Sequence, residues 1–250
     1  MKPPENDATG LSTGAYRHRS WPTWILLLVC LTGTAMAGWY TKTSLNVVAE
    51  REFKLVCNEI QCKINDRLRA HEQILRSGAA FLMHSGSASR EDWRRFTERQ
   101  KVAQQLPGIQ GIGFSLVIPA EKLAQHIEEI RVEGFPDYHV RPTGERAIYT
   151  SIIYLEPFAD RNLRAFGYDM FSEPVRRAAM EQARDEDAAA LSGKVVLVQE
   201  TEKDVQAGTL MYVPVYDAKM PSTTRTQRRA ALRGWVYSPY RMNDLMRGIM

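Results

Sequence analysis

The chain has 250 residues, and its 33 Lys and Arg against 29 Asp and Glu give a formal net charge of +4 at pH 7. Hydrophobic residues make up 44% and charged residues 25%, which are ordinary globular values and exclude a disordered or fibrous protein. The small basic excess, with no zinc-finger, RNP or basic-zipper pattern, argues against nucleic acid as a partner. This length allows one or two domains, each with a hydrophobic core.

A membrane-spanning helix is predicted over residues 21–41, after a polar tail over residues 1–20 that we expect in the cytoplasm. The apolar run is free of charged residues up to Tyr40, and about twenty helical residues span the roughly 30 Å hydrocarbon core of a bilayer. Trp and Tyr flank the run at both ends, as interfacial aromatic residues do. Because Arg17 and Arg19 precede it, the positive-inside rule predicts that the rest of the chain is exported.

A cleaved signal peptide is the alternative for the same run. Ala35-Met36-Ala37 has the A-x-A form of a cleavage site, and the preceding leucine-rich stretch would serve as its apolar region. The length of the run and its flanking aromatic residues favour an uncleaved anchor. Both alternatives export everything that follows.

Residues 42–84 are predicted to form one long stalk helix without an interrupting proline. Apolar positions recur at three- and four-residue steps along a narrow stripe, at Phe53, Cys57, Ile60, Ile64, Leu68, His71, Leu75 and Leu82. Such a stripe packs on the following domain or on the same helix of a second copy, and we expect a homodimer through this stalk. Cys57 and Cys62 point in different directions on a helix, so they cannot easily bridge each other. We expect His71 to be a packed, hydrogen-bonded interior residue.

Helix and strand patterns alternate over residues 85–250. Helices are expected from Ser89 to Pro107, over residues 120–134, from Ser172 as the N-cap with Pro174 in the first turn, and from Tyr240 onward. Strands are expected at IQGIGFSLVIP, RAIYTSIIYLEPF, KVVLVQE, GTLMYVPVYD and RGWVYSP, with a loop at STTRTQRRAALR. No βαβ regularity is present, so the class is α+β, with mixed or antiparallel sheets and helices on one side.

Catalytic and metal-binding signatures are missing from the sequence. It has no Gly-rich phosphate loop, G-x-S-x-G elbow or H-E-x-x-H, and its five histidines are scattered singly. We therefore expect no enzyme activity, cofactor or metal in this chain. His139, two positions after Asp137, is weak evidence for acid–base chemistry, and an exported hydrolase that uses His139 or Asp169 is the least favoured alternative.

Asp169 stands out because it lies between aromatic residues in the stretch FGYDMFSEP. It either caps the following helix or pairs with an arginine, or it is a polar group that accepts hydrogen bonds from a small ligand in an apolar pocket. The Tyr- and Trp-bearing strands downstream form either core or the wall of such a pocket.

Several segments together closely resemble the CHASE domain, the extracytoplasmic sensory module of bacterial receptors and of plant cytokinin-receptor histidine kinases. The resemblance covers roughly residues 45–250 and is carried by LPGIQGIGFSLVIP, GYDMFSEPVRRAAMEQARD, GKVVLVQE, GTLMYVPVYD and RGWVYSPYRMNDLM. It implies a long stalk helix and two PAS-like subdomains, with ligand held in the membrane-distal one.

The resemblance also implies site residues. The family's ligand-contacting aspartate falls on Asp169 and an apolar pocket residue on Leu197, with Met170 and Tyr212 as neighbouring wall residues. The plant receptors carry a small polar residue where this chain has Val198, so cytokinin itself is not the expected ligand.

The function implied is the small-molecule-sensing segment of a receptor in the bacterial inner membrane, with its sensory domain in the periplasm. Such receptors pass ligand occupancy through stalk and membrane helices to a cytoplasmic output domain, such as a histidine kinase or a diguanylate cyclase. We expect this chain to be truncated before a second membrane helix and that output domain. The alternative is a secreted or anchored periplasmic binding protein without signalling output.

Overall fold

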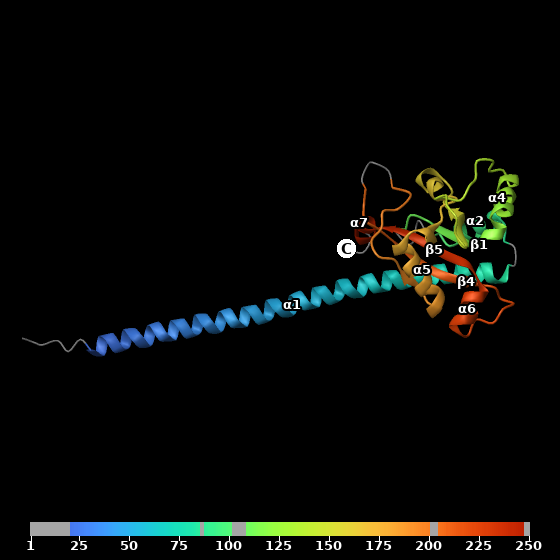
Figure 1. Cartoon of the computed structure of the whole chain (residues 1–250). Helices are drawn as coiled ribbons and strands as arrows, with labels where there is room; N and C mark the ends of the chain where they lie inside the picture. Colours follow the sequence, from blue (N-terminus) through green and yellow to red (C-terminus); the bar gives the residue numbers. More distant parts are fainter. Residues whose placement is uncertain (1–20, 86–87, 102–108, 201–204, 248–250) are drawn as a thin grey trace, which may run out of the picture. The chain divides into compact units, whose positions relative to one another are not determined.

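The structure, a computed structural model, describes residues 21–85, 88–101, 109–200 and 205–247 (Figure 1). The chain divides into two compact units, residues 1–58 and residues 59–250. The predicted cytoplasmic tail over residues 1–20 lies outside the described residues.

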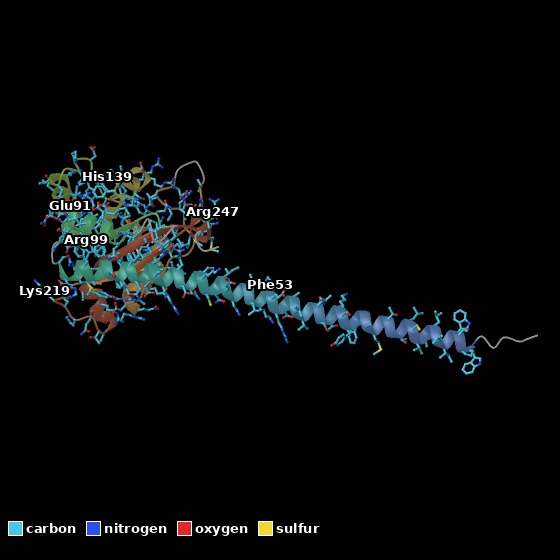
Figure 2. All side chains as sticks on the ribbon, turned by 180° about the vertical axis from the view of Figure 1, so that it is seen from behind. Phe53, Glu91, Arg99, His139, Lys219 and Arg247 are labelled. Carbon is cyan, nitrogen blue, oxygen red and sulfur yellow. The ribbon has the colours of Figure 1, made fainter. Side chains whose placement is uncertain are left out.

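Helix α1 (Trp21–His84) is a single α-helix of 64 residues, so the helical conformation predicted for residues 21–41 and 42–84 is confirmed. Among the described residues it is the one helix long and apolar enough to cross a membrane. Within the first unit its apolar side chains are exposed, including Phe53, which is labelled in Figure 2. The boundary at residue 41 between membrane span and stalk stays a prediction.

The second unit contains a five-stranded sheet with the order β2-β1-β5-β4-β3, in which every pair is antiparallel. The strands are β1 (Ile112–Pro119), β2 (Ile148–Glu156), β3 (Ala190–Leu191), β4 (Gly208–Tyr216) and β5 (Leu232–Arg241). The helices are α2 (Arg90–Arg99), α4 (Leu123–Val132), α5 (Pro174–Glu186), α6 (Arg225–Ala231) and α7 (Met242–Arg247). Short 3₁₀ turns are η1 (Ala120–Lys122), η2 (Asp160–Ala165) and η3 (Met170–Ser172). The α+β class is confirmed.

The two PAS-like subdomains stay a prediction, whereas the described strands form one sheet. The reason is strand β5, which pairs on one side with β1, where Gly113 faces Tyr237, and on the other side with β4, where Tyr212 faces the same Tyr237. The two helix-and-strand groups seen in the sequence therefore complete a single sheet.

Side chains alternate between the two faces of this sheet and bury two hydrophobic clusters. On strand β4, Met211 and Val213 join the first cluster, which holds Leu75 of α1 and Trp93 of α2. Leu210 and Tyr212 join the second cluster, together with Ala179, Met180 and Ala183 of α5. Helices thus pack on both faces, and the expectation that they lie on one side is wrong.

Local signals at helix ends were correct for α2 and α4. Ser89 and Asp92 form the capping box predicted for α2, which satisfies backbone N–H groups at the helix start. Helix α4 ends just before Gly134, whose φ of +107° favours glycine. Helix α2 ends at Arg99 with Gln100 as its C-cap, so the prediction that it continues to Pro107 is wrong; Pro107 itself lies outside the described residues.

Three further local predictions are wrong. The first is that Ser172 is the N-cap of α5. The N-cap is Glu173, whose carboxylate accepts from Val175 N and Arg176 N, while the Ser172 hydroxyl donates to the backbone oxygen of Asp169 at 2.6 Å. Pro174 does occupy the first turn. The stretch KVVLVQE is not a strand, because only Val195 forms a β-bridge.

The third wrong prediction is the loop at STTRTQRRAALR, which forms α6. Its capping box joins Thr224 and Gln227 and satisfies backbone N–H groups at the helix start. This signal was present in the sequence at the same three-residue spacing as the one in α2.

Candidate ligand-binding site

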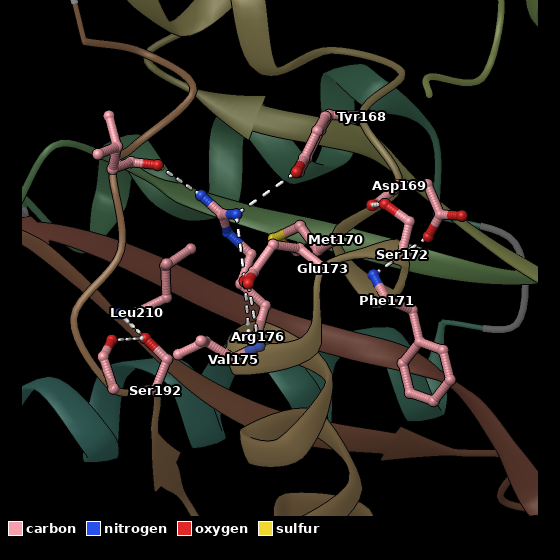
Figure 3. Close-up of polar contacts among 12 residues, drawn as sticks. Tyr168, Asp169, Met170, Phe171, Ser172, Glu173, Val175, Arg176, Ser192 and Leu210 are labelled. Atoms are coloured by element: carbon pink, nitrogen blue, oxygen red, sulfur yellow. Dashed lines mark hydrogen bonds and ion pairs between the residues drawn. The ribbon is translucent and has the colours of Figure 1, made fainter. Parts of the chain in front are cut away.

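Asp169 lies in the connection between β2 and α5, and its side chain is fully buried. Its Oδ1 accepts hydrogen bonds from Thr150 N at 3.1 Å and from Thr150 Oγ1 at 2.6 Å. It also accepts from Phe171 N at 3.1 Å (Figure 3). Its Oδ2 lies 3.2 Å from Nε of Arg146. The carboxylate therefore caps η3 and pairs with an arginine. Both contacts belong to the structural alternative that the sequence left open for Asp169. Oδ2 accepts no hydrogen bond in the part of the chain that the structure describes, so a ligand donor that reaches Asp169 could bind this atom beside the ion pair with Arg146.

Met170, Leu197 and Tyr212 are buried together in the second hydrophobic cluster. The Tyr212 hydroxyl donates to Sδ of Met170 at 3.6 Å, and burial raises the pKa of this phenol well above its usual value. The structure thus brings these predicted site residues to the α5 face of the sheet, with Asp169 next to Met170 in the chain. Their role in ligand binding stays a prediction.

Arg176 is a buried arginine on the same face that the sequence reasoning missed. It donates to the backbone oxygen of Val196 at 2.8 Å, pairs with Glu173 at 3.4 Å, and lies over the ring of Tyr168 (Figure 3). The signal for it was its position one turn before Ala179 and Met180, on the apolar stripe of α5. Arg176 fixes the segment that carries Leu197 against this helix.

A cavity of about 70 Å³ lies between strands β1, β2 and β5 and the elements η3, α5 and α6. Its lining residues are mostly apolar or aromatic with two arginines among them: Val117, Ile148, Thr150, Phe171, Arg184, Arg229, Leu232 and Trp235. Phe171 and Trp235 stack with their ring centroids 5.8 Å apart. Thr150, which bonds Asp169, connects this cavity to the buried carboxylate. A small, partly open hollow with mostly apolar walls and a few polar groups is the candidate small-molecule site of this face.

The surroundings of His139 differ from those of an acid–base pair. Its Nδ1 lies 2.9 Å from the backbone oxygen of Asp137, not from the carboxylate. The two residues line an open surface pocket of about 280 Å³ together with Phe135, Tyr138 and Phe166. Among the residues that the structure describes, no group of three or more His, Cys, Asp or Glu could hold a metal ion.

The chain matches the family model of the CHASE domain over residues 86–250, which is more than half of its length, and it belongs to that family. CHASE domains are extracytoplasmic sensory domains of receptors. The resemblance seen in the sequence is confirmed for these residues, and the whole of helix α1 precedes them. No curated protein matches the chain.

Proposed function

We propose that this chain is the extracytoplasmic sensing segment of a membrane receptor, which binds a small molecule in the cavity beside Asp169. The observation that supports this most is the cavity itself, which is lined by both the sheet and the helices on this face within a CHASE domain. Ligand occupancy would pass through the stalk and membrane parts of α1 to a cytoplasmic output domain, such as a histidine kinase or a diguanylate cyclase.

Strand β5 offers a physical route from the cavity to α1. Trp235 lines the cavity, while its neighbour Val236 faces the opposite side of the sheet and packs in the cluster that holds Leu75 of α1. Arg233 of the same strand donates to the backbone oxygen of Leu82 at 3.1 Å. A ligand that binds one arrangement of β5 more tightly than another would shift the population of α1 positions.

A cavity-filling variant tests the binding site. Val117→Phe adds volume to the cavity wall, whereas Val132→Phe makes the same change at a side chain that is 79% exposed. The purified full chain in mild detergent is screened against small metabolites by thermal shift. We expect a ligand to raise the melting temperature of the wild type and of Val132→Phe but not of Val117→Phe. Equal shifts in all three proteins would place binding outside the cavity.

The proposed location is the bacterial inner membrane, crossed once by α1, with the sensory domain in the periplasm. Protease digestion of spheroplasts tests it, because residues beyond 58 should be cleaved from outside while intact cells protect them. The mass of the mature chain separates an anchor from a periplasmic binding protein released by cleavage after Ala37. An intact N-terminus is the expected result.

The proposed partner of the stalk is the same helix of a second copy. Phe53 and Val56 are exposed apolar residues, and the thiols of Cys57 and Cys62 are free and exposed. Oxidation in membranes should therefore yield a disulfide-linked dimer, with Cys57→Ser and Cys62→Ser as the matched controls. Failure of every cysteine to cross-link would argue against a stalk dimer.

A further inference from the structure

We propose that the ligand of this cavity carries a carboxylate, which Arg184 and Arg229 bind. This inference rests on the proposed function and adds the chemical class of the ligand. The two arginines come from α5 and α6, and both line the cavity.

The charge around these arginines is unbalanced. Asp185 accepts from Arg184 Nε at 2.7 Å and from Arg229 Nε at 2.9 Å, and Arg225 Nε lies 3.9 Å from it. Hydrogen bonds from Arg229 and Arg184 hold the pKa of this carboxyl well below its usual range. A fourth guanidinium, that of Arg228, donates to the backbone oxygen of Asp185. The Asp185 carboxylate thus pairs with three guanidinium groups, and the backbone oxygen of the same residue accepts from a fourth.

Glu181 and Asp169 do not neutralise the positive charge of these arginines. Glu181, which interacts electrostatically with Arg229, is exposed, so water screens its charge. Asp169 lies beyond Thr150, and its carboxylate is already paired with Arg146 at 3.2 Å. Arg184 and Arg229 thus place two positive charges in the cavity lining, next to the single carboxylate of Asp185.

Hydrogen-bond donors remain for a ligand. Arg184 gives only its Nε to Asp185, and Arg229 gives its Nε and Nη2. Both Nη atoms of Arg184 and Nη1 of Arg229 make no hydrogen bond to other residues in the part of the chain that the structure describes. Guanidinium groups bind carboxylates through pairs of such N–H donors, with charge-assisted hydrogen bonds.

The size of the cavity limits the ligand. A volume of about 70 Å³ is roughly twice the share of one water molecule in the liquid, about 30 Å³. It holds a carboxylate with one or two further carbons, whose apolar part would contact Phe171, Trp235 and Leu232. Such a small ligand binds no tighter than a few micromolar, since affinity per heavy atom has a ceiling of about 1.5 kcal/mol.

The experiment is calorimetric titration of the full chain in mild detergent with acetate, propionate and acetamide, each to millimolar concentration. Arg229→Gln removes one donor at a half-exposed side chain, and Arg225→Gln removes the same charge from a residue outside the cavity lining. We expect propionate or acetate to bind, acetamide not to bind, and Arg229→Gln to weaken binding about tenfold or more. Arg225→Gln should change it less than threefold.

Arg184→Gln should weaken carboxylate binding to a similar degree, and Arg184→Lys should restore part of it. Equal binding of acetamide and acetate, or equal losses in the Arg225→Gln and Arg229→Gln variants, would overturn the inference. So would the absence of carboxylate binding to a wild-type chain that melts cooperatively. A neutral compound that Val117→Phe excludes and Arg229→Gln retains would overturn only the ligand class. Compounds that bind Val117→Phe unchanged would overturn the proposed site as well.

Discussion

His71 allows a quantitative test of how α1 is held against the sheet. Its side chain is fully buried, and its ring stacks on that of Tyr240 with centroids 5.0 Å apart. Neither ring nitrogen has a hydrogen-bond partner among the described residues, so the expected interior hydrogen bond is not formed. Burial, together with the nearby charge of Arg67, lowers the pKa of His71 from 6.5 to about 4.

This depressed pKa makes folding stability depend on pH. The unfolded chain binds a proton at His71 below about pH 6.5, whereas the folded chain does so only near pH 4. The stabilising contribution is therefore complete above pH 6.5 and is lost as the pH falls from 6.5 through 4. The two pKa values of His71, 6.5 in the unfolded chain and about 4 in the folded chain, correspond to a loss of about 2 kcal/mol in the free energy of unfolding between pH 7 and pH 5.

Chemical denaturation of the full chain in mild detergent at pH 7 and pH 5 measures this loss. His71→Phe keeps a stacked ring but cannot titrate, so the wild type should lose about 2 kcal/mol more than this variant. His139→Gln, at an exposed position, should follow the wild type. Buried His126 is common to all three proteins, and its contribution cancels in the comparison. The reasoning is refuted if His71→Phe and the wild type lose the same free energy.

Three further substitutions test other contacts by denaturation at pH 7. Asp169→Asn leaves Arg146 without its carboxylate and should cost about 3 kcal/mol. Gly113→Ala should cost about 2 kcal/mol, because the new Cβ would lie 2.5 Å from the ring of Tyr237. Thr224→Ala should cost about 1 kcal/mol, because it removes the N-cap of α6.

Matched controls isolate each cause. Asp187→Asn changes an exposed carboxylate and should leave stability within about 0.5 kcal/mol of the wild type. Gly38→Ala adds a Cβ that meets no atom within 4 Å, and Thr226→Ala removes an exposed hydroxyl inside α6. A test variant that loses no more stability than its control contradicts the contact assigned to it.

Elements with a strong local signal were predictable from the sequence. The apolar stripe from Phe53 to Leu82, the capping box at Ser89 and the glycine after α4 each act within a few residues, so their patterns are visible in the sequence. The capping box at Thr224 was equally visible, and α6 was missed only because the arginines around it were interpreted as a loop.

Features that depend on distant pairing were not predictable. The stretch KVVLVQE is apolar enough for a strand, but Ala190–Leu191 occupies the edge of β4 instead. The union of the strands in one sheet depends on β5, whose pattern alone does not say which neighbours it pairs with. Propensity is a weak prior that such tertiary contacts override.

The candidate site shows the same limit. Asp169 was singled out correctly as a buried, context-dependent carboxylate, yet its partners Thr150 and Arg146 lie 19 or more positions earlier in the chain. The cavity arginines Arg184 and Arg229 come together because Asp185 of α5 binds Arg229 of α6. The sequence contains no spacing pattern from which the contact between α5 and α6 could have been predicted.

The central strand of the sheet is also its last one in the chain. Ser238 of β5 donates to the backbone oxygen of Gly111 at 2.8 Å, across 127 positions of sequence. The β1–β2 pair and strand β4 are not neighbours in the sheet and are joined only through β5. The sheet therefore has a high contact order and should assemble slowly and late. During biosynthesis, a nascent chain stalled before residue 232 would present two unpaired strand edges to chaperones and proteases.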